Sequence, residues 1–288
     1  MVKGVDGMTL RTKTRLTQPK IVGVVNITSD SFSDGGLYLQ PEKALAHARQ
    51  LAFDGADVIE LGAASSHPDA APVSSEEEIS RLTPVLAGLY GLGVMLSVDT
   101  TQREVQKFAI ASGIRILNDI RGFPASDDHF ALASSHCTLV VMHSISGRYK
   151  ADRIPTDPNT VYESICEFFY NRLASLTSAG VAREHIIIDP GMGFFLGSNP
   201  ESSLAILAHL AALRRQFDLP LMVSVSRKSF LRNLMPLANC DLQSRTLAAE
   251  IFAAQQGIDY IRTHNVGALR QALATLAAVA QAGTLVRL

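Results

Sequence analysis

The chain has 288 residues, of which 47% are hydrophobic and 18% are charged, and this is enough to bury a large core. Its formal net charge of -1 gives no electrostatic sign of nucleic acid or of an anionic membrane as a partner. No apolar run approaches the ~20 residues of a membrane-spanning helix, and the N-terminus lacks a signal peptide's apolar stretch. We therefore expect a cytoplasmic protein without nucleic-acid or membrane partners.

Eight short apolar runs recur along the chain and are typical of buried strands. They begin at Ile21, Asp57, Val94, Ile114, Thr138, His185, Leu221 and Asp259. A segment with a helical pattern follows each run, at residues 41–55, 74–89, 101–113, 129–135, 161–180, 201–217, 242–257 and 266–283, and the fourth pattern is the weakest. Short apolar strands that alternate with helices indicate a parallel sheet covered on both faces.

The number of these units favours an α/β fold of the closed kind, a (β/α)8 TIM barrel, over an open doubly wound sheet. No glycine-rich dinucleotide motif follows the first strand. The polar loop NITSDSFSDGG stands there instead, at residues 26–36, and its length is typical of a functional loop. No linker or repeat divides the chain, so we expect a polar N-terminal arm at residues 1–18 and a single barrel domain at 19–288.

Polar residues end or follow most of the predicted strands, where barrel enzymes carry their active sites. In chain order they are Asn26, Glu60, Asp99, Asn118 with Asp119, His143, Asp189, Ser226–Arg227–Lys228, and Arg262 with His264. A cap or a turn explains any one of them. Together they require a polar ligand or a water-filled cleft, because a buried polar group without a partner costs about 1–3 kcal/mol.

Two subsites follow from the chemistry of these side chains. Donors and acceptors suited to a flat heterocycle with amide and amino edges come from Asp99, Asn118, Asp189 and Lys228. An anion or metal–diphosphate subsite is expected from Asn26, Arg262 and His264, because arginine grips phosphate oxygens in pairs. We assign Glu60 and Asp119 to structural pairing or capping.

Motifs from the first strand to the last resemble those of the dihydropteroate synthase family. They are GVVNITSDSFSDGG, DVIELGAASSHPDAAPVSSEEE, SVDT, ILNDIRG, IIDPGMGF, VSVSRKSF and IRTH, from residue 23 to residue 264. The resemblance implies a homodimeric barrel of the folate biosynthesis pathway. Its substrates would be 6-hydroxymethyl-7,8-dihydropterin diphosphate and p-aminobenzoate, with Mg2+ on the diphosphate.

The resemblance also implies residue roles. The pterin would be held by Asp99, Asn118, Asp189 and Lys228, with Met142 packed on its ring. The diphosphate would be held by Asn26, Ser66, Arg262 and His264, with Mg2+ on Asn26. The p-aminobenzoate would be bordered by Phe32, Ser66, Pro68, Phe194, Ser226, Lys228 and Ser229. The catalytic set would be Asp30 and Asp34 of the first mobile loop with Lys228, Arg262 and His264.

Departures from the family pattern fall in the loops. Ser29 replaces a proline, Ala64 a glutamate and His67 an arginine, Phe123-Pro124 stands where a glycine-rich turn is common, and Phe195 and Leu196 add bulk to an apparent insertion. The pattern is similar to that of the mobile, sulfonamide-resistant branch of the family. The alternative is neutral sequence drift, because flexible loops tolerate substitutions. We expect the segment 194–197 to exclude sulfonamides from the arylamine site.

Two other functions compete with this interpretation. A pterin-binding methyltransferase barrel, which presents methyltetrahydrofolate to a corrinoid protein, shares the Asp and Asn pterin grip. It has no need of the SRK and RxH motifs of a diphosphate site. A non-catalytic pterin-binding protein has no need of Asn26, Asp189, Lys228 and Arg262 together.

Overall fold

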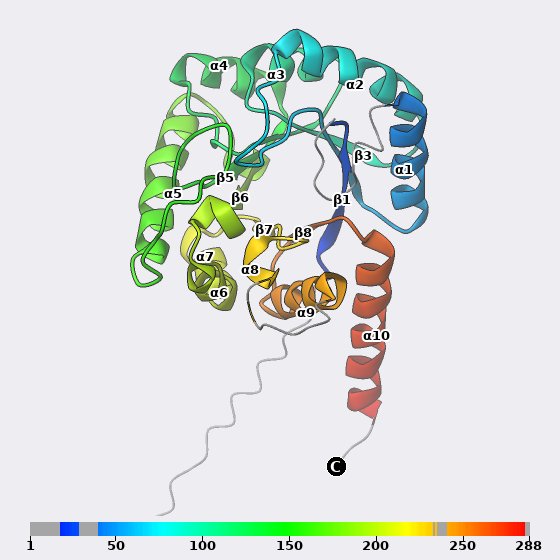
Figure 1. Ribbon diagram of the computed structural model, residues 1–288, viewed down its shortest axis with the longest axis vertical. Helices are drawn as coiled ribbons and strands as arrows, with labels where there is room; N and C mark the ends of the chain where they lie inside the picture. The colour runs from blue at the N-terminus through cyan, green and yellow to red at the C-terminus, as the bar shows by residue number, and fades with distance from the viewer. Residues whose placement is uncertain (1–17, 29–39, 233, 235–240, 286–288) are drawn as a thin grey trace, which may run out of the picture.

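Eight parallel strands form a closed barrel in the computed structural model, which describes residues 18–28, 40–232, 234 and 241–285 (Figure 1). The strands are β1 Lys20–Asn26, β2 Val58–Gly62, β3 Met95–Asp99, β4 Ile116–Asp119, β5 Thr138–Met142, β6 Ile186–Asp189, β7 Met222–Val223 and β8 Tyr260–Thr263. Their order is β6-β5-β4-β3-β2-β1-β8-β7. A single parallel bridge between Ile188 and Leu221 joins the two ends of this sheet. The predicted (β/α)8 barrel is therefore confirmed.

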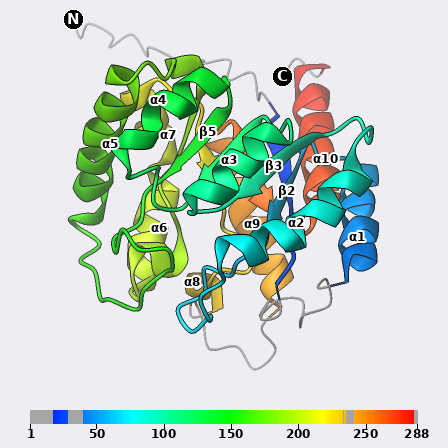
Figure 2. The same cartoon turned by 90° about the horizontal axis from the view of Figure 1, so that it is seen from above.

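Helices surround the strands on the outside (Figures 1 and 2). They are α1 Pro41–Phe53, α2 Ser75–Leu89, α3 Arg103–Ala111, α4 Ser126–Ser135, α5 Val161–Ser178, α6 Pro200–Ala208, α7 Leu210–Phe217, α8 Ser229–Arg232, α9 Leu242–Gln255 and α10 Val266–Leu285. The segment predicted as one helix at 201–217 is split at His209, whose N–H bonds three residues back to Ile206. None of the described helices is long and apolar enough to cross a membrane.

Part of the prediction lies outside the described residues. The expected N-terminal arm, apart from Gln18, belongs to that part, and so do Ser29, Asp30, Phe32 and Asp34 of the first loop. The domain boundaries and the roles given to these loop residues therefore stay predictions.

The interior of the barrel is layered, and the layers follow from the two-residue period of a strand. Six buried side chains form an apolar floor: Val22, Val58, Ile116, Val140, Ile187 and Met222. Side chains two positions further along a strand point the same way. Those residues are Val24, Glu60, Asn118, Met142, Asp189 and Ser224, and most of them are polar. A polar layer therefore rests on the apolar floor at the carboxyl ends of the strands.

The outward-facing residues of the strands hold the helices in place. Ile21, Ile59, Leu117, Leu139 and Ile188 are fully buried in the main core cluster against the helices. Each such side chain contributes about 1.5–3 kcal/mol by its removal from water. This outer core stabilises the barrel without using the polar layer, which is left available for function.

Candidate active site

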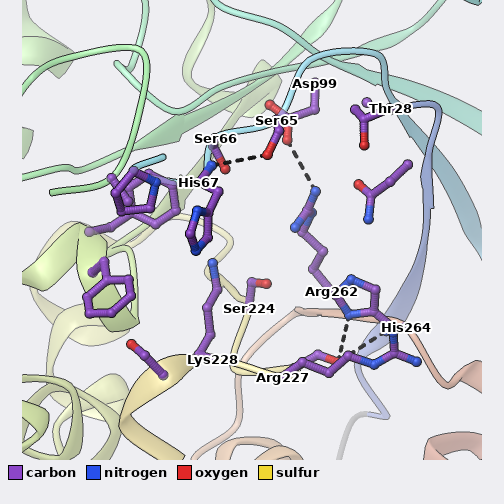
Figure 3. A pocket seen from close by; sticks show the side chains of 18 of the residues that line it. Thr28, Ser65, Ser66, His67, Asp99, Ser224, Arg227, Lys228, Arg262 and His264 are labelled. Atoms are coloured by element: carbon purple, nitrogen blue, oxygen red, sulfur yellow. Dashed lines mark hydrogen bonds and ion pairs between the residues drawn. The ribbon is translucent and has the colours of Figure 1, made fainter. Parts of the chain in front are cut away.

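A cavity of about 400 Å³ opens above the polar layer. Its walls come from the carboxyl ends of the strands and from the loops that follow them. Among the predicted site residues, the cavity is lined by Asn26, Ser66, Pro68, Asp99, Phe194, Ser226, Lys228, Ser229, Arg262 and His264 (Figure 3). The structure thus brings together residues that are up to 238 positions apart, from Asn26 to His264.

Arg262 stands at the centre of the site in an ion-pair network. Its Nε donates to the Glu60 carboxylate, and its Nη2 donates to Asp99 Oδ2 at 3.1 Å. Glu60 is completely buried and also accepts bonds from Ser97 Oγ at 3.3 Å and Asn118 Nδ2 at 3.1 Å. The pairing role predicted for Glu60 is confirmed, but its partners are residues of the site itself.

Burial and mutual repulsion change the acidity of this network. Burial, together with the nearby Glu60 charge, raises the pKa of Asp99 to about 7, although Arg262 opposes the change. For Arg262, burial works to lower the pKa, but the charges of Glu60 and Asp99 outweigh it and the pKa is raised. Arg262 is therefore a permanent cation, whereas Asp99 can exchange a proton near neutral pH.

Asp189 and Lys228 are two further charged groups of the site, and both interact with the charge of Arg262. Burial raises the pKa of Asp189 to about 6. The N–H of Gly191, which donates to Asp189 Oδ1 at 2.8 Å, and the charges of Lys228 and Arg262 act in the opposite direction and lower it. Burial, and then repulsion from Arg262, lowers the pKa of Lys228 to about 8. Both groups can be charged together between these values, which is a suitable state for binding a polar neutral heterocycle.

Three residues expected to hold the pterin lie beneath the cavity surface rather than on it. Asn118, Asp189 and Met142 are only 2%, 2% and 6% exposed. The Oδ1 of Asn118 is buried and has no hydrogen-bond partner within the described structure. Such an acceptor calls for an N–H donor from a ligand or a water.

The subsite expected for diphosphate is rich in positive charge. His264 Nδ1 lies 2.9 Å from Ser226 Oγ, and the pKa of His264 is lowered well below its ordinary value by burial and then by Arg227, Arg262 and Lys228. Figure 3 shows Arg227 beside His264, with its side chain directed away from Lys228. Arg227 has a left-handed backbone, with φ of 59°, and this sharp turn separates the two cations.

On the arylamine side, the Lys228 ammonium lies 4.7 Å from the centre of the Phe195 ring and points toward His67 (Figure 3). Phe195 packs with Ile120 and Met142, so it belongs to the expected pterin floor. Phe194 is half-buried at the cavity wall. Ser226, expected here, instead directs its hydroxyl to His264.

Two of the loop departures, Leu196 and Phe123, do not border the cavity, so only part of the segment 194–197 can act on the arylamine site. Leu196 is fully buried in the core behind the loop. Phe123 is buried too, and its carbonyl accepts bonds from Arg172 and His129. Bulk at these two positions fills the scaffold rather than the site.

Sequence reasoning missed several lining residues, among them Thr28, Ala151 and Ser224, and it gave no role to Arg227, which it had placed at the rim. Thr28 could have been found, because it belongs to the same NIT motif as Asn26. Its Oγ1 is buried and lacks a hydrogen-bond partner within the described structure. Asn26 and Thr28 together offer two oxygen donors of the hard kind that Mg2+ prefers.

The described residues contain no group of three or more His, Cys, Asp or Glu side chains that could hold a metal ion by themselves. A magnesium ion at Asn26 would therefore need most of its ligands from water and from a substrate. This donor set fits a metal that arrives with a diphosphate, since Mg2+ usually keeps several waters and binds phosphate oxygens.

Residues 22–264 match the model of the pterin binding enzyme family. Dihydropteroate synthase type-3 of Escherichia coli is 51% identical over 257 residues, which cover 88% of this chain and 97% of that protein. The type-2 enzyme of the same organism is 52% identical over 259 residues, with 90% and 95% covered.

Solved structures of 34% identity agree with these relatives. Dihydropteroate synthase of Xanthomonas albilineans with 4-aminobenzoic acid has a TM-score of 0.80, with 92% of this chain and 94% of that chain covered. The Yersinia pestis enzyme, in a sulfonamide drug complex, has a TM-score of 0.82, with 92% and 96% covered.

Proposed function

The chain belongs to the dihydropteroate synthases of the pterin-binding enzyme family, and on this premise we propose how its cavity joins 6-hydroxymethyl-7,8-dihydropterin diphosphate to p-aminobenzoate. The observation that carries the proposal is the division of the cavity into two kinds of wall. Acceptors lie at the partly buried Asp99 and at the buried Asn118 and Asp189, and cations gather at Lys228, Arg262 and Arg227.

The pterin ring lies on the polar layer in this proposal. Asp189 accepts two neighbouring N–H groups of the ring, the unpartnered Oδ1 of Asn118 accepts another, and Asp99 completes the edge. Met142 and Phe195 form the apolar surface on which the ring packs. Each charge-assisted bond contributes about 1.5–3 kcal/mol.

The diphosphate lies at the cationic wall, between Arg262, His264 and Ser66. Burial, and then repulsion from nearby cations, lowers the pKa of His264. An anion at this wall offsets the second of these causes, so binding shifts His264 toward the protonated form, which can neutralise leaving-group charge. Asn26 and Thr28 are the residues that would hold Mg2+. When bound, the ion supplies further neutralisation of the diphosphate.

The reaction then breaks the bond between the pterin methylene and the diphosphate oxygen and forms a bond from the methylene to the arylamine nitrogen. The proton lost by that nitrogen is taken up by the released diphosphate or by water. Water in the cavity competes with the arylamine for the methylene, so the loops must exclude it. Asp30, Phe32 and Asp34 remain the candidates for this task in the first loop.

In this proposal the p-aminobenzoate lies between Pro68, Phe194 and Ser229, beside Lys228. A sulfonamide carries a further substituent where the substrate ends in a carboxylate. The half-buried ring of Phe194 stands at this wall, so we propose that the drug is excluded sterically while the substrate fits.

The decisive experiment incubates the purified protein with the pterin diphosphate and Mg2+, with or without p-aminobenzoate. Diphosphate release and 7,8-dihydropteroate are expected only when the arylamine is present. A methyltransferase barrel or a non-catalytic binder gives neither product, and release without arylamine would indicate hydrolysis. The homodimer and the cytoplasmic location also remain proposals, and analytical ultracentrifugation tests the first.

A further inference from the structure

The connection between β5 and α5 contributes Ala151 to the cavity lining and is bonded to the loop that follows β2. We name residues 145–156 the strap and residues 64–70 loop 2. The N–H of Ala151 donates to the Ser66 carbonyl at 3.0 Å. The Lys150 ammonium donates to two further carbonyls of loop 2, at 2.9 and 3.3 Å.

The same strap is bonded to the β6–α6 loop on the other side of the mouth. The Ile145 N–H donates to the Phe195 carbonyl at 3.0 Å, and the Ser198 N–H donates to the Ile154 carbonyl at 2.9 Å. Both walls of the proposed arylamine pocket are therefore bonded to one segment.

Arg153 contacts both walls with one side chain. Its guanidinium donates two parallel bonds to the Asp69 carboxylate of loop 2, at 2.9 and 2.6 Å. The guanidinium carbon also lies 5.5 Å from the centre of the Phe194 ring. Planar arginine is suited to this double contact, because it pairs in two bonds with a carboxylate and stacks on an aromatic ring.

We propose that Arg153 is a positioning residue that fixes loop 2 against Phe194 and so sets which arylamines the pocket accepts. Asp69 and Arg153 are 84 positions apart and lie outside the catalytic and binding sets named above. The inference rests on the proposed function, because it concerns the arylamine pocket of that same site.

The alternative is an ion pair that adds only general stability. Both side chains are about half exposed, and most exposed pairs contribute little. The two explanations differ in what they change. A positioning role alters the balance between substrate and inhibitor, whereas a stability role lowers the melting temperature and leaves that balance unchanged.

The test compares Arg153→Met, which removes the charge but keeps the aliphatic stem, with Arg148→Met on the same segment. Arg148 is 73% exposed and pairs only loosely with Asp152, at 3.6 Å, so it is a matched control. In Arg153→Met we expect the KM for p-aminobenzoate to rise roughly two- to fivefold, as for one exposed pair, with kcat nearly unchanged. The inhibition constant of sulfamethoxazole relative to that KM should fall by a similar factor.

A second measurement does not depend on activity. Hydrogen exchange of the backbone amides of loop 2 should become faster in Arg153→Met and in Asp69→Arg, and should return toward wild type when Asp69→Arg is combined with Arg153→Asp. This measurement keeps the proposed function and the role of Arg153 separable. If the wild-type protein had no synthase activity, the proposed function would be rejected, but hydrogen exchange in loop 2 would still report on the contact between Arg153 and Asp69.

Faster exchange, a shifted inhibitor balance and recovery in the charge-reversed pair support the positioning role. The proposal is overturned if Arg148→Met has the same effects, if the charge-reversed pair gives no recovery, or if Arg153→Met changes only the melting temperature.

Discussion

Glu60 has no exposed surface, yet it is bonded to Arg262, whose guanidinium faces the cavity. The fully buried carboxylate thus orients a cation that is central to the proposed site. Removing its charge breaks a buried pair, which costs about 3–5 kcal/mol. We expect Glu60→Gln to lower the melting temperature strongly and to weaken the binding of the pterin diphosphate. Thermal unfolding and KM measure the two effects, and the exposed Glu104→Gln is the control. An unchanged melting temperature would show that the pair is not a structural support.

Asp189 should bind the pterin only in its ionised form. Because its pKa is raised to about 6, affinity should be full above that value and should fall as the pH decreases through it. Asp189→Asn should weaken binding tenfold or more at pH 7.5, as expected for the loss of a charge-assisted bond of about 1.5–3 kcal/mol. It should also remove the part of the pH dependence centred near 6 and leave the part that Asp99, whose pKa is raised to about 7, contributes. Calorimetry with pteroate checks both, and binding within twofold of wild type would reject the role.

His264 should matter for the diphosphate rather than for the pterin. His264→Ala is expected to raise the KM of the pterin diphosphate roughly tenfold, and to change the affinity for a pterin without diphosphate by less than twofold. Each ligand serves as the control for the other in the same protein. If the binding of both ligands were weakened equally, His264 would support the fold instead, through its contact with Ser226.

We propose Phe194, rather than the whole segment 194–197, as the residue that excludes the drug. Leu196 is buried in the core, so a deletion through it would disturb the barrel. Phe194→Ala should lower the inhibition constant of sulfamethoxazole about tenfold, equivalent to about 1.4 kcal/mol, and raise the KM for p-aminobenzoate by a smaller factor. If the variant still resists the drug, Ala64 and His67 of loop 2 are the next residues to change. A wild type that is inhibited as readily as an ordinary family member would reject the resistance proposal.

Glu250 should make stability depend on pH. Burial raises its pKa from 4.5 to about 7, so the folded state prefers the protonated carboxyl. Its contribution is fully present below about pH 4.5 and is lost as the pH rises through 7. Glu250→Gln should therefore be more stable than wild type by about 1–3 kcal/mol at pH 8, and equal to it near pH 4.5. Urea unfolding at the two pH values measures this, with the exposed Glu184→Gln as control. A constant difference at both pH values would contradict it.

The strand pattern predicted much of the site, because strand period and topology alone bring Asp99, Asn118 and Asp189 to one rim. The same rule placed Arg262 there, but it gave no sign that Glu60 would be its partner. Contacts between loops could not be predicted. Asp69 and Arg153 meet only because two connections happen to cross the same mouth. Arg227 was placed at the rim but given no role, since its orientation depends on a left-handed backbone that nothing in its residue type requires.

The barrel is closed by one weakly paired pair of strands, β6 and β7. A single bridge, Ile188 to Leu221, connects β6 to the two-residue strand β7, whereas β1 and β2 are paired over five positions. Asp189 is the last residue of β6, and Lys228 lies in the loop after β7. A pterin bound to both residues would therefore connect the two weakly paired strands. Ligand occupancy would then restrain the motion that could open the barrel, so that substrate binding and closure of the scaffold become one event.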